Sequence, residues 1–312
     1  MAFDFSCVVA PFRMQPGLRR LAPGAQQLTP NESGDRALRE KLAVLSSYRD
    51  QAFVADPAFD AGPALDALAA HAAAEHPDAF ACDGPDSCSA FRLGWTLRNG
   101  RLLGDGAPEI GALLGSLAPA WRRAGLLSLA FAEDFAVIDG STGRIPWLAV
   151  CLPSNWAPEE KVGRHFAEVH APVADNATLL AAADHLARLV TGVDRWERFV
   201  WTLTDDPRLH RHPRRAPATR WDPQLAPEAL ARNAFFRTER QTFIPMPALR
   251  QAVFTIHVEV QPLQAAVAAR ADRDRLHAAL GSMSPAVLAY RGLEVARDRL
   301  LAWLAQSAAD AE

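Results

Sequence analysis

Cysteine is scarce in this chain: only four occur among 312 residues. A long chain with so few cysteines is not a disulfide-rich secreted scaffold, so a hydrophobic core must hold its fold. Cys7 and Cys151 lie in apolar stretches and are expected to be buried. Cys82 and Cys88 flank the turn-rich sequence DGPDS, a loop that could hold a metal or a redox pair. Their spacing is not CxxC and no second pair lies nearby, so neither kind of site is predicted.

The chain also lacks an excess of charge of either sign, since its formal net charge is -3. Nucleic-acid-binding proteins usually carry a concentrated basic face. The local basic run at residues 208–215 is interrupted and preceded by prolines, Pro213 and Pro207. Proline breaks helices, so these arginines are expected on a solvated loop. No nucleic-acid partner is predicted.

Long apolar runs are missing as well. The alanine-rich segments are interrupted by charges well before the ~20 apolar residues that a membrane-spanning helix requires. Asp4 stands where a secretory signal would have a basic region followed by an apolar stretch. These features predict a cytoplasmic protein without a membrane-spanning segment.

Apolar residues are nevertheless plentiful, at 49% of the chain. This content is ordinary for a soluble globular protein, and the length predicts one large domain or two closely packed ones. The sequence suggests a mostly helical N-terminal region at residues 1–119, a core at 120–262, and C-terminal helices packed on that core at 263–312. The individual helices expected in the two outer regions are residues 36–52, 64–75, 107–124, 265–280 and a segment from Ser284 to Leu304.

Strand patterns dominate the middle of the chain. Residues 128–139 and 144–152 predict a β-hairpin around a Gly-rich turn. Three further strands are expected at residues 196–204, 234–244 and 251–260, the last with strict alternation of apolar and polar side chains.

Two helices are expected between these groups of strands. Ser154 or Asn155 can cap the first helix, Pro158 suits its first turn, and Pro172 ends it. The second runs over residues 178–190. The element order is therefore two strands, helices and three strands, which is the order of a PAS domain.

Three ordered blocks carry a family resemblance. They are LPSNWAPEEKVGRHFAEVHAPV at residues 152–173, EDFAVIDG at 133–140 and FRTERQTF at 236–243. Together they resemble the haem-dependent oxidative N-demethylase alpha subunits, whose haem sits in a PAS-like domain. The resemblance covers roughly residues 120–262. It implies an α+β fold, a PAS-like antiparallel sheet with helices across one face, and haem b as the cofactor.

A haem iron needs an axial ligand, and neutral imidazole is the usual one. Of nine histidines, His165 and His170 lie on or beside the helix after the hairpin. They are five residues apart, about 140° around a helix, so they cannot easily bind one metal together. We favour His170 as the iron ligand because it ends the helix within the most characteristic family block. The alternative, a helix C-terminal histidine stabilised by the dipole, stays open. His257 is interpreted as a surface residue.

Haem propionates require cations or hydrogen-bond donors. Lys161 and Arg164 flank the ligand helix, while Arg237, Arg240 and Gln241 lie on a later polar strand. Alternation places Arg237 and Gln241 on one face of that strand and Arg240 on the other. The strand is either an exposed edge or the wall of a polar cavity. Arg240 is the preferred propionate anchor, because arginine binds carboxylates in a bidentate manner and the family block keeps the triplet ERQ together.

The resemblance implies oxidative N-demethylation of a small secondary amine, such as dimethylamine, beside the haem. Glu239 and Glu133 are the candidate carboxylates for holding the alkylammonium. The chain lacks a four-cysteine iron–sulfur motif and a GxGxxG loop, so the electrons are expected from a separate reductase subunit that carries flavin and iron–sulfur. The alternatives are a non-catalytic PAS-like haem sensor or scaffold, and an interaction domain without flavin or metal.

Overall fold

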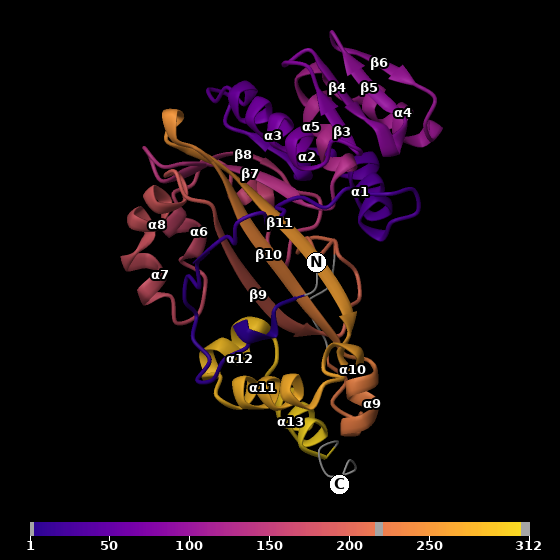
Figure 1. The fold of residues 1–312 in the computed structure, drawn as a ribbon. Coiled ribbons are helices and arrows are strands. Elements are labelled where there is room, and N and C mark those ends of the chain that lie inside the picture. Colours follow the sequence, from indigo (N-terminus) through magenta and orange to yellow (C-terminus); the bar gives the residue numbers. More distant parts are fainter. Residues whose placement is uncertain (1–2, 216–220, 307–312) are drawn as a thin grey trace.

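The computed structural model describes residues 3–215 and 221–306 and has the expected α+β architecture (Figure 1). Its larger sheet has seven strands in the order β1-β9-β10-β11-β7-β8-β2. Every neighbouring pair is antiparallel, which confirms the prediction of one antiparallel sheet across residues 120–262. The strands are β1 (Arg19–Arg20), β2 (Phe53–Ala55), β7 (Asp134–Asp139), β8 (Arg144–Ala149), β9 (Trp196–Thr204), β10 (Phe235–Met246) and β11 (Gln251–Pro262).

The register of the long strands fixes which side chains share a face. β10 pairs with both β9 and β11, so that Gln241 lies between Arg198 and Ile256. Successive strand residues point to opposite faces, and Glu239 therefore shares the face of Gln241 whereas Arg240 does not. A short 3₁₀ turn, η4 (Pro247–Leu249), connects β10 to β11.

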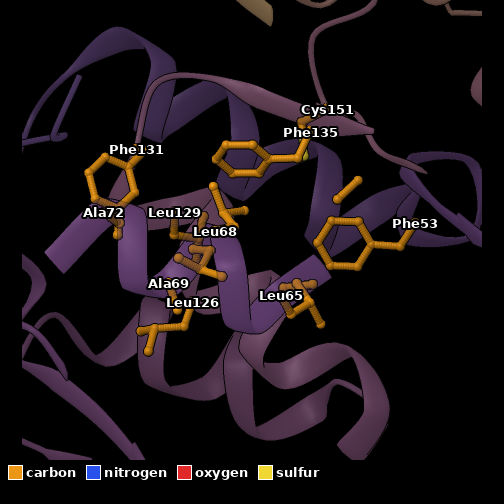
Figure 2. Packing of buried hydrophobic residues seen from close by; sticks show 14 of the residues in the cluster. Phe53, Leu65, Leu68, Ala69, Ala72, Leu126, Leu129, Phe131, Phe135 and Cys151 are labelled. Carbon is orange, nitrogen blue, oxygen red and sulfur yellow. The ribbon is translucent and has the colours of Figure 1, made fainter. Parts of the chain in front are cut away.

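Helices of the N-terminal region pack on one face of this sheet. They are α1 (Arg36–Ser47), α2 (Arg49–Ala52), α3 (Gly62–Glu75), α4 (Pro108–Ser116) and α5 (Pro119–Ala130), with a 3₁₀ turn η1 (Phe5–Cys7) before them. The apolar faces of α3 and α5 meet the sheet in a continuous core, where Leu68, Leu126 and Phe135 are almost fully buried (Figure 2). The prediction of a strand from residue 128 is wrong, because α5 continues to Ala130 and β7 begins only at Asp134.

A second, four-stranded sheet interrupts the N-terminal helices and was not predicted (Figure 1). Cys82 and Cys88 face each other across its first two strands and form a disulfide, rather than remaining free thiols on a loop. The strands are β3 (Phe80–Cys82), β4 (Ser87–Ala90), β5 (Trp95–Arg98) and β6 (Arg101–Gly104), with the turn η2 (Phe91–Leu93) between β4 and β5. Helix α4 packs closely on this sheet at Gly111, where an added Cβ would lie 2.4 Å from the ring of Trp95 on β5.

Short helices cover the other face of the large sheet. They are η3 (Pro158–Glu160), α6 (Phe166–His170), α7 (Ala177–Ala181) and α8 (Ala183–Val190). The prediction of one helix from Pro158 is wrong, because Pro158 begins only a single 3₁₀ turn and Gly163 then adopts a left-handed conformation with φ of 71°. α6 is instead capped by His165, whose side chain accepts a hydrogen bond from the Ala167 amide. The expected second helix is divided between α7 and α8 at Ala182.

The C-terminal helices pack around the far ends of β9 and β10 (Figure 1). Trp201, Phe236 and Leu300 are buried in this second core, where these helices meet the sheet. The segment predicted from Ser284 begins as expected, with Ser284 capping the helix, but it breaks at Gly292 with φ of 64°. The helices are α9 (Pro227–Arg232), α10 (Leu263–Ala266), α11 (Arg270–Gly281), α12 (Pro285–Arg291) and α13 (Arg297–Gln306). In the part of the chain that the structure describes, none of the helices has the length and apolarity that crossing a membrane would require.

Candidate functional site

A cavity of about 360 Å³ lies between the large sheet and helices α6 to α8. Its volume falls within the range of small-molecule and cofactor sites. The N-terminal segment, through Met14 to Leu18, and α12 also contribute to its wall. Most of the wall is apolar: Ala136, Ile138, Leu148, Phe243, Phe254 and Ile256 come from the sheet, and Phe166, Val169, Leu179, Leu186 and Val190 from the helices.

The apolar wall follows from strand alternation. On β7, Ala136 and Ile138 share one face, and Phe254 on β11 pairs directly with Ala136. The opposite sides of these strands pack against the helices of the N-terminal region. β7 is thus buried on both faces, which is why it is apolar at every position from Phe135 to Ile138.

His170 enters this cavity from the C-terminal end of α6. Its Nδ1 lies 2.8 Å from the carbonyl oxygen of Phe166, and the two rings pack with centroids 4.1 Å apart. A carbonyl can only accept, so Nδ1 carries the proton and donates it. Burial lowers the pKa of His170 to about 4, against the effect of this hydrogen bond. The imidazole is therefore neutral near pH 7, and its Nε2 lone pair is available to a metal.

Glu239 and Gln241 bring polar groups into the cavity from β10. The amide Nε2 of Gln241 donates to the Glu239 carboxylate at 2.6 Å, and Glu239 is only 9% exposed. Tyr290 of α12 also lines the cavity, and its pKa is raised by burial, with the charge of Glu239 adding to that effect. The register places Glu239 and Gln241 on one face. This face lines a cavity rather than an exposed edge, but most of the cavity wall is apolar and not polar as expected.

Arg198 on β9 is a cavity residue that the sequence analysis missed. Burial lowers the pKa of its guanidinium, while the charge of Glu239 opposes that shift. Its Nε is shielded from solvent and has no hydrogen-bond partner among the described residues. The available signal was a charge flanked by Trp196 and Val200 on one face of the strand.

Lys161 is a second cation at the cavity wall. Its Nζ donates to the carbonyl oxygen of Val169 at 3.2 Å, so one of its three protons is already engaged within the ligand-helix region. Burial lowers its pKa, and the neighbouring Glu160 partly offsets the shift. Lys161 can therefore donate a hydrogen bond to a bound group, but one of its protons is already used in the hydrogen bond to Val169.

His165 and Arg164 lie outside the cavity lining. The Nε2 of His165 is 3.1 Å from the Asp184 carboxylate, and its Nδ1 caps α6. Arg164 is exposed and donates through Nε to the carbonyl oxygen of Glu160 at 2.7 Å. Both side chains thus hold the local backbone in place and do not contact the space beside His170.

The two arginines of β10 are also engaged elsewhere. Arg237 is buried and donates to Ser154 Oγ at 2.9 Å and to the carbonyl oxygen of Leu209 at 2.9 Å. It therefore joins the loop that precedes η3 to the segment after β9. Arg240 points to the opposite face of the sheet, where it pairs with Glu197 at 3.0 Å and donates to the backbone of the N-terminal segment.

Glu133 lies on the face of the sheet that is remote from the cavity. It is buried and pairs with Nδ1 of His257 at 2.7 Å, while the Thr29 amide donates to its other oxygen at 2.9 Å. The interpretation of His257 as a surface residue is wrong, because its side chain is only 16% exposed. Burial opposes its charge, but the carboxylates of Glu133 and Glu259 outweigh that effect and raise its pKa to about 9.

Sheet and site together define a class of protein: an α+β ligand-binding protein whose apolar cavity offers one neutral imidazole, one carboxylate and two cations. The chain belongs to the family described as haem-dependent oxidative N-demethylase, alpha subunit-like, whose model matches residues 35–301. Membership supports a haem-dependent, oxidative N-demethylase-like function and, through the word subunit, implies a partner chain.

The residues of the cavity fit a haem. Apolar side chains on both walls suit a porphyrin, and an imidazole whose Nδ1 is held by a carbonyl is the usual form of a metal-ligating histidine. His170 would hold the iron through Nε2. The cationic side chains of Arg198 and Lys161, which also line the cavity, would be the groups to hold its propionates.

Proposed function

We propose that the chain binds haem b in this cavity, with His170 as the axial ligand, and oxidatively demethylates a small secondary amine such as dimethylamine. The single observation that carries this proposal is the state of His170, a neutral imidazole in the wall of an apolar cavity, with Nδ1 fixed by the Phe166 carbonyl and Nε2 without a hydrogen bond to the described residues. In the overall reaction, dimethylamine, molecular oxygen, two electrons and two protons give methylamine, formaldehyde and water. Haem supplies the activation of oxygen when it is bound.

Glu239 is the residue that we assign to the amine. An ammonium group that enters an apolar cavity loses hydration, and a buried carboxylate compensates through a charge-assisted hydrogen bond. The Gln241 amide holds one oxygen of Glu239 and so orients the carboxylate. A bound ammonium has no lone pair, and Glu239 is the group in the cavity that can accept its proton. The apolar wall beside it, with Val200 and Ile256, accommodates methyl groups.

The fold supports a PAS-like assignment for residues 120–262. Two strands, β7 and β8, are followed by the short helices and then by three strands, β9 to β11, as in the element order of a PAS domain. We further propose a cytoplasmic location and a reductase partner that carries flavin and iron–sulfur. The family's designation as an alpha subunit supports a partner.

Two measurements on the purified full-length chain test this function. A Soret band in the visible spectrum is expected if haem is bound. With a reductase added, dimethylamine should then stimulate oxygen uptake and release formaldehyde in equal amounts, and Glu239→Gln should lower this rate while leaving the Soret band in place. A haem spectrum without amine-dependent turnover would instead support a haem sensor, and a colourless protein that cannot be loaded with haem would support a scaffold.

A further inference from the structure

We infer that Arg198 is a carboxylate-binding residue of the cavity. Its ligand is an acidic group of a bound molecule, either a haem propionate or the carboxylate of an N-methyl amino acid. The choice of these two ligands rests on the proposed function. The inference adds an anion-binding group to the cavity, which binding of a simple amine would not require.

The first observation is a partly buried cation without a hydrogen-bond partner within the residues that the structure describes. None of the described residues accepts a hydrogen bond from Arg198, and its Nε is shielded from solvent. A guanidinium has five donors, and leaving them unpaired in an apolar site is costly. The two described arginines that are almost fully buried are satisfied: Arg211 donates to the side chains of Asn155 and Thr204, and Arg237 donates to several carbonyl oxygens.

The second observation is that the nearest carboxylate is already occupied. Glu239 lies on the neighbouring strand, and its charge influences Arg198. No ion pair joins the two in the described part of the chain, and Glu239 is instead held by Gln241 at 2.6 Å. In the pairing of β9 with β10, Arg198 lies opposite Gln241, and Glu239 lies opposite Val200. The charges of Arg198 and Glu239 therefore lie diagonally across the cavity wall. A molecule with an ammonium group and a carboxylate matches this pair of opposite charges.

The third observation is that Arg198 is better suited to bind a carboxylate than the other cation of the cavity. Among the described residues that line the cavity, Arg198 is the only arginine, and Lys161 already donates to the Val169 carbonyl. Arginine presents two parallel donors that match the two oxygens of a carboxylate, which an ammonium group does not do.

The first experiment compares haem with haem dimethyl ester, whose propionates carry no charge. Both are titrated into the full-length apoprotein, as wild type, Arg198→Met and the control Arg164→Leu, and the Soret band is followed. If Arg198 binds a propionate, Arg198→Met weakens haem binding about tenfold or more and leaves the ester unchanged. Arg164→Leu, which removes an exposed cation outside the cavity, should match wild type with both ligands.

The second experiment compares N-methylglycine with dimethylamine by calorimetry, on haem-loaded and on ligand-free protein. If Arg198 binds a substrate carboxylate, Arg198→Met loses about tenfold or more in affinity for N-methylglycine while its affinity for dimethylamine is kept. A response in either experiment supports the inference and identifies the source of the carboxylate. Unchanged affinities in both would overturn it.

The stability of the ligand-free variant distinguishes a binding role from a structural one. Removing an unpaired, partly buried charge should raise the urea midpoint of Arg198→Met above that of wild type. Loss of a structural contact would lower it, and that result would count against the inference. Failure of the proposed function has a different signature. In that case no variant binds haem, and the calorimetry on ligand-free protein still tests Arg198.

Discussion

At the scale of single residues, the chemistry of this protein depends on which atom of a side chain is already engaged. His170 and His165 are close in sequence and both make hydrogen bonds within α6. His170 uses Nδ1 for a carbonyl and keeps Nε2 for the cavity. His165 uses Nδ1 for the helix cap and Nε2 for Asp184. The same residue type therefore provides a potential ligand at one position and a capping group at the other.

This difference predicts opposite effects of two matched substitutions. His170→Ala should abolish haem retention or convert the Soret spectrum, because it removes the only histidine among the described residues that line the cavity. His165→Ala should keep the axial ligation and cost about 1 kcal/mol of stability through the lost cap. Spectra of the purified variants and their urea midpoints measure both effects. If His165→Ala loses the haem signal and His170→Ala keeps it, the ligand assignment fails.

The His257–Glu133 pair predicts a dependence of stability on pH. The folded-state pKa of His257, about 9, lies above its usual value of 6.5. The charged pair therefore contributes its full stability below pH 6.5, and the contribution is lost as the pH rises through 9. Urea unfolding of wild type and His257→Gln at about pH 6 and about pH 9.5, on either side of this window, measures it. The difference between the two proteins should be larger at the lower pH, and a constant difference would refute the assignment.

At the scale of elements, the long strands of the large sheet were predicted more accurately than the helices that cover it. The range 196–204 coincides with β9, because Phe199, Trp201 and Leu203 recur at every second position, which is a strand signal. The prediction of a long helix from Pro158 was wrong because it relied on the capping residues before Pro158, whereas Gly163 interrupts the helix after a single turn. Arg198 was missed for a related reason: alternation separates the two faces of a strand but does not reveal which face will border a cavity. That choice depends on α6 to α8, which pack against the sheet from elsewhere in the sequence.

The contact between the β7–β8 turn and the end of α8 predicts a specific effect of added volume. A Cβ at Gly140 would lie 2.1 Å from Oγ1 of Thr191 and 3.0 Å from the backbone oxygen of Arg250. Gly140→Ala should therefore destabilise the protein by about 1–3 kcal/mol, the usual cost of overpacking. Gly115→Ala is the control, because no atom lies within 4 Å of its added Cβ.

In α4, that control change should be neutral or stabilising by up to about 1 kcal/mol through helix propensity. Chemical unfolding of Gly140→Ala and Gly115→Ala measures whether the added Cβ is destabilising only where it meets neighbouring atoms. Equal stability of Gly140→Ala and wild type would show that the turn and α8 separate at little cost.

At the scale of the whole molecule, the sequence predicted the large antiparallel sheet but not the second sheet at residues 80–104. Its strands are three or four residues long, so alternation has too little length to be recognised between turn residues. The family resemblance covered the middle of the chain, whereas the family model extends over residues 35–301 and takes in this sheet as well. Neither source indicated that the first residues of the chain would help to form the cavity.

That participation has a consequence for choosing fragments of this protein by homology. The family match begins at residue 35, yet Met14, Pro16 and Leu18 form part of the cavity wall, and Gln27 donates to Thr242 from the segment that follows. A fragment that starts at residue 35 would therefore have an incomplete cavity although it contains every residue of the family match. We expect it to lose bound haem faster than the full-length chain on transfer to apomyoglobin. Equal transfer rates would mean that the N-terminal wall does not retain the ligand.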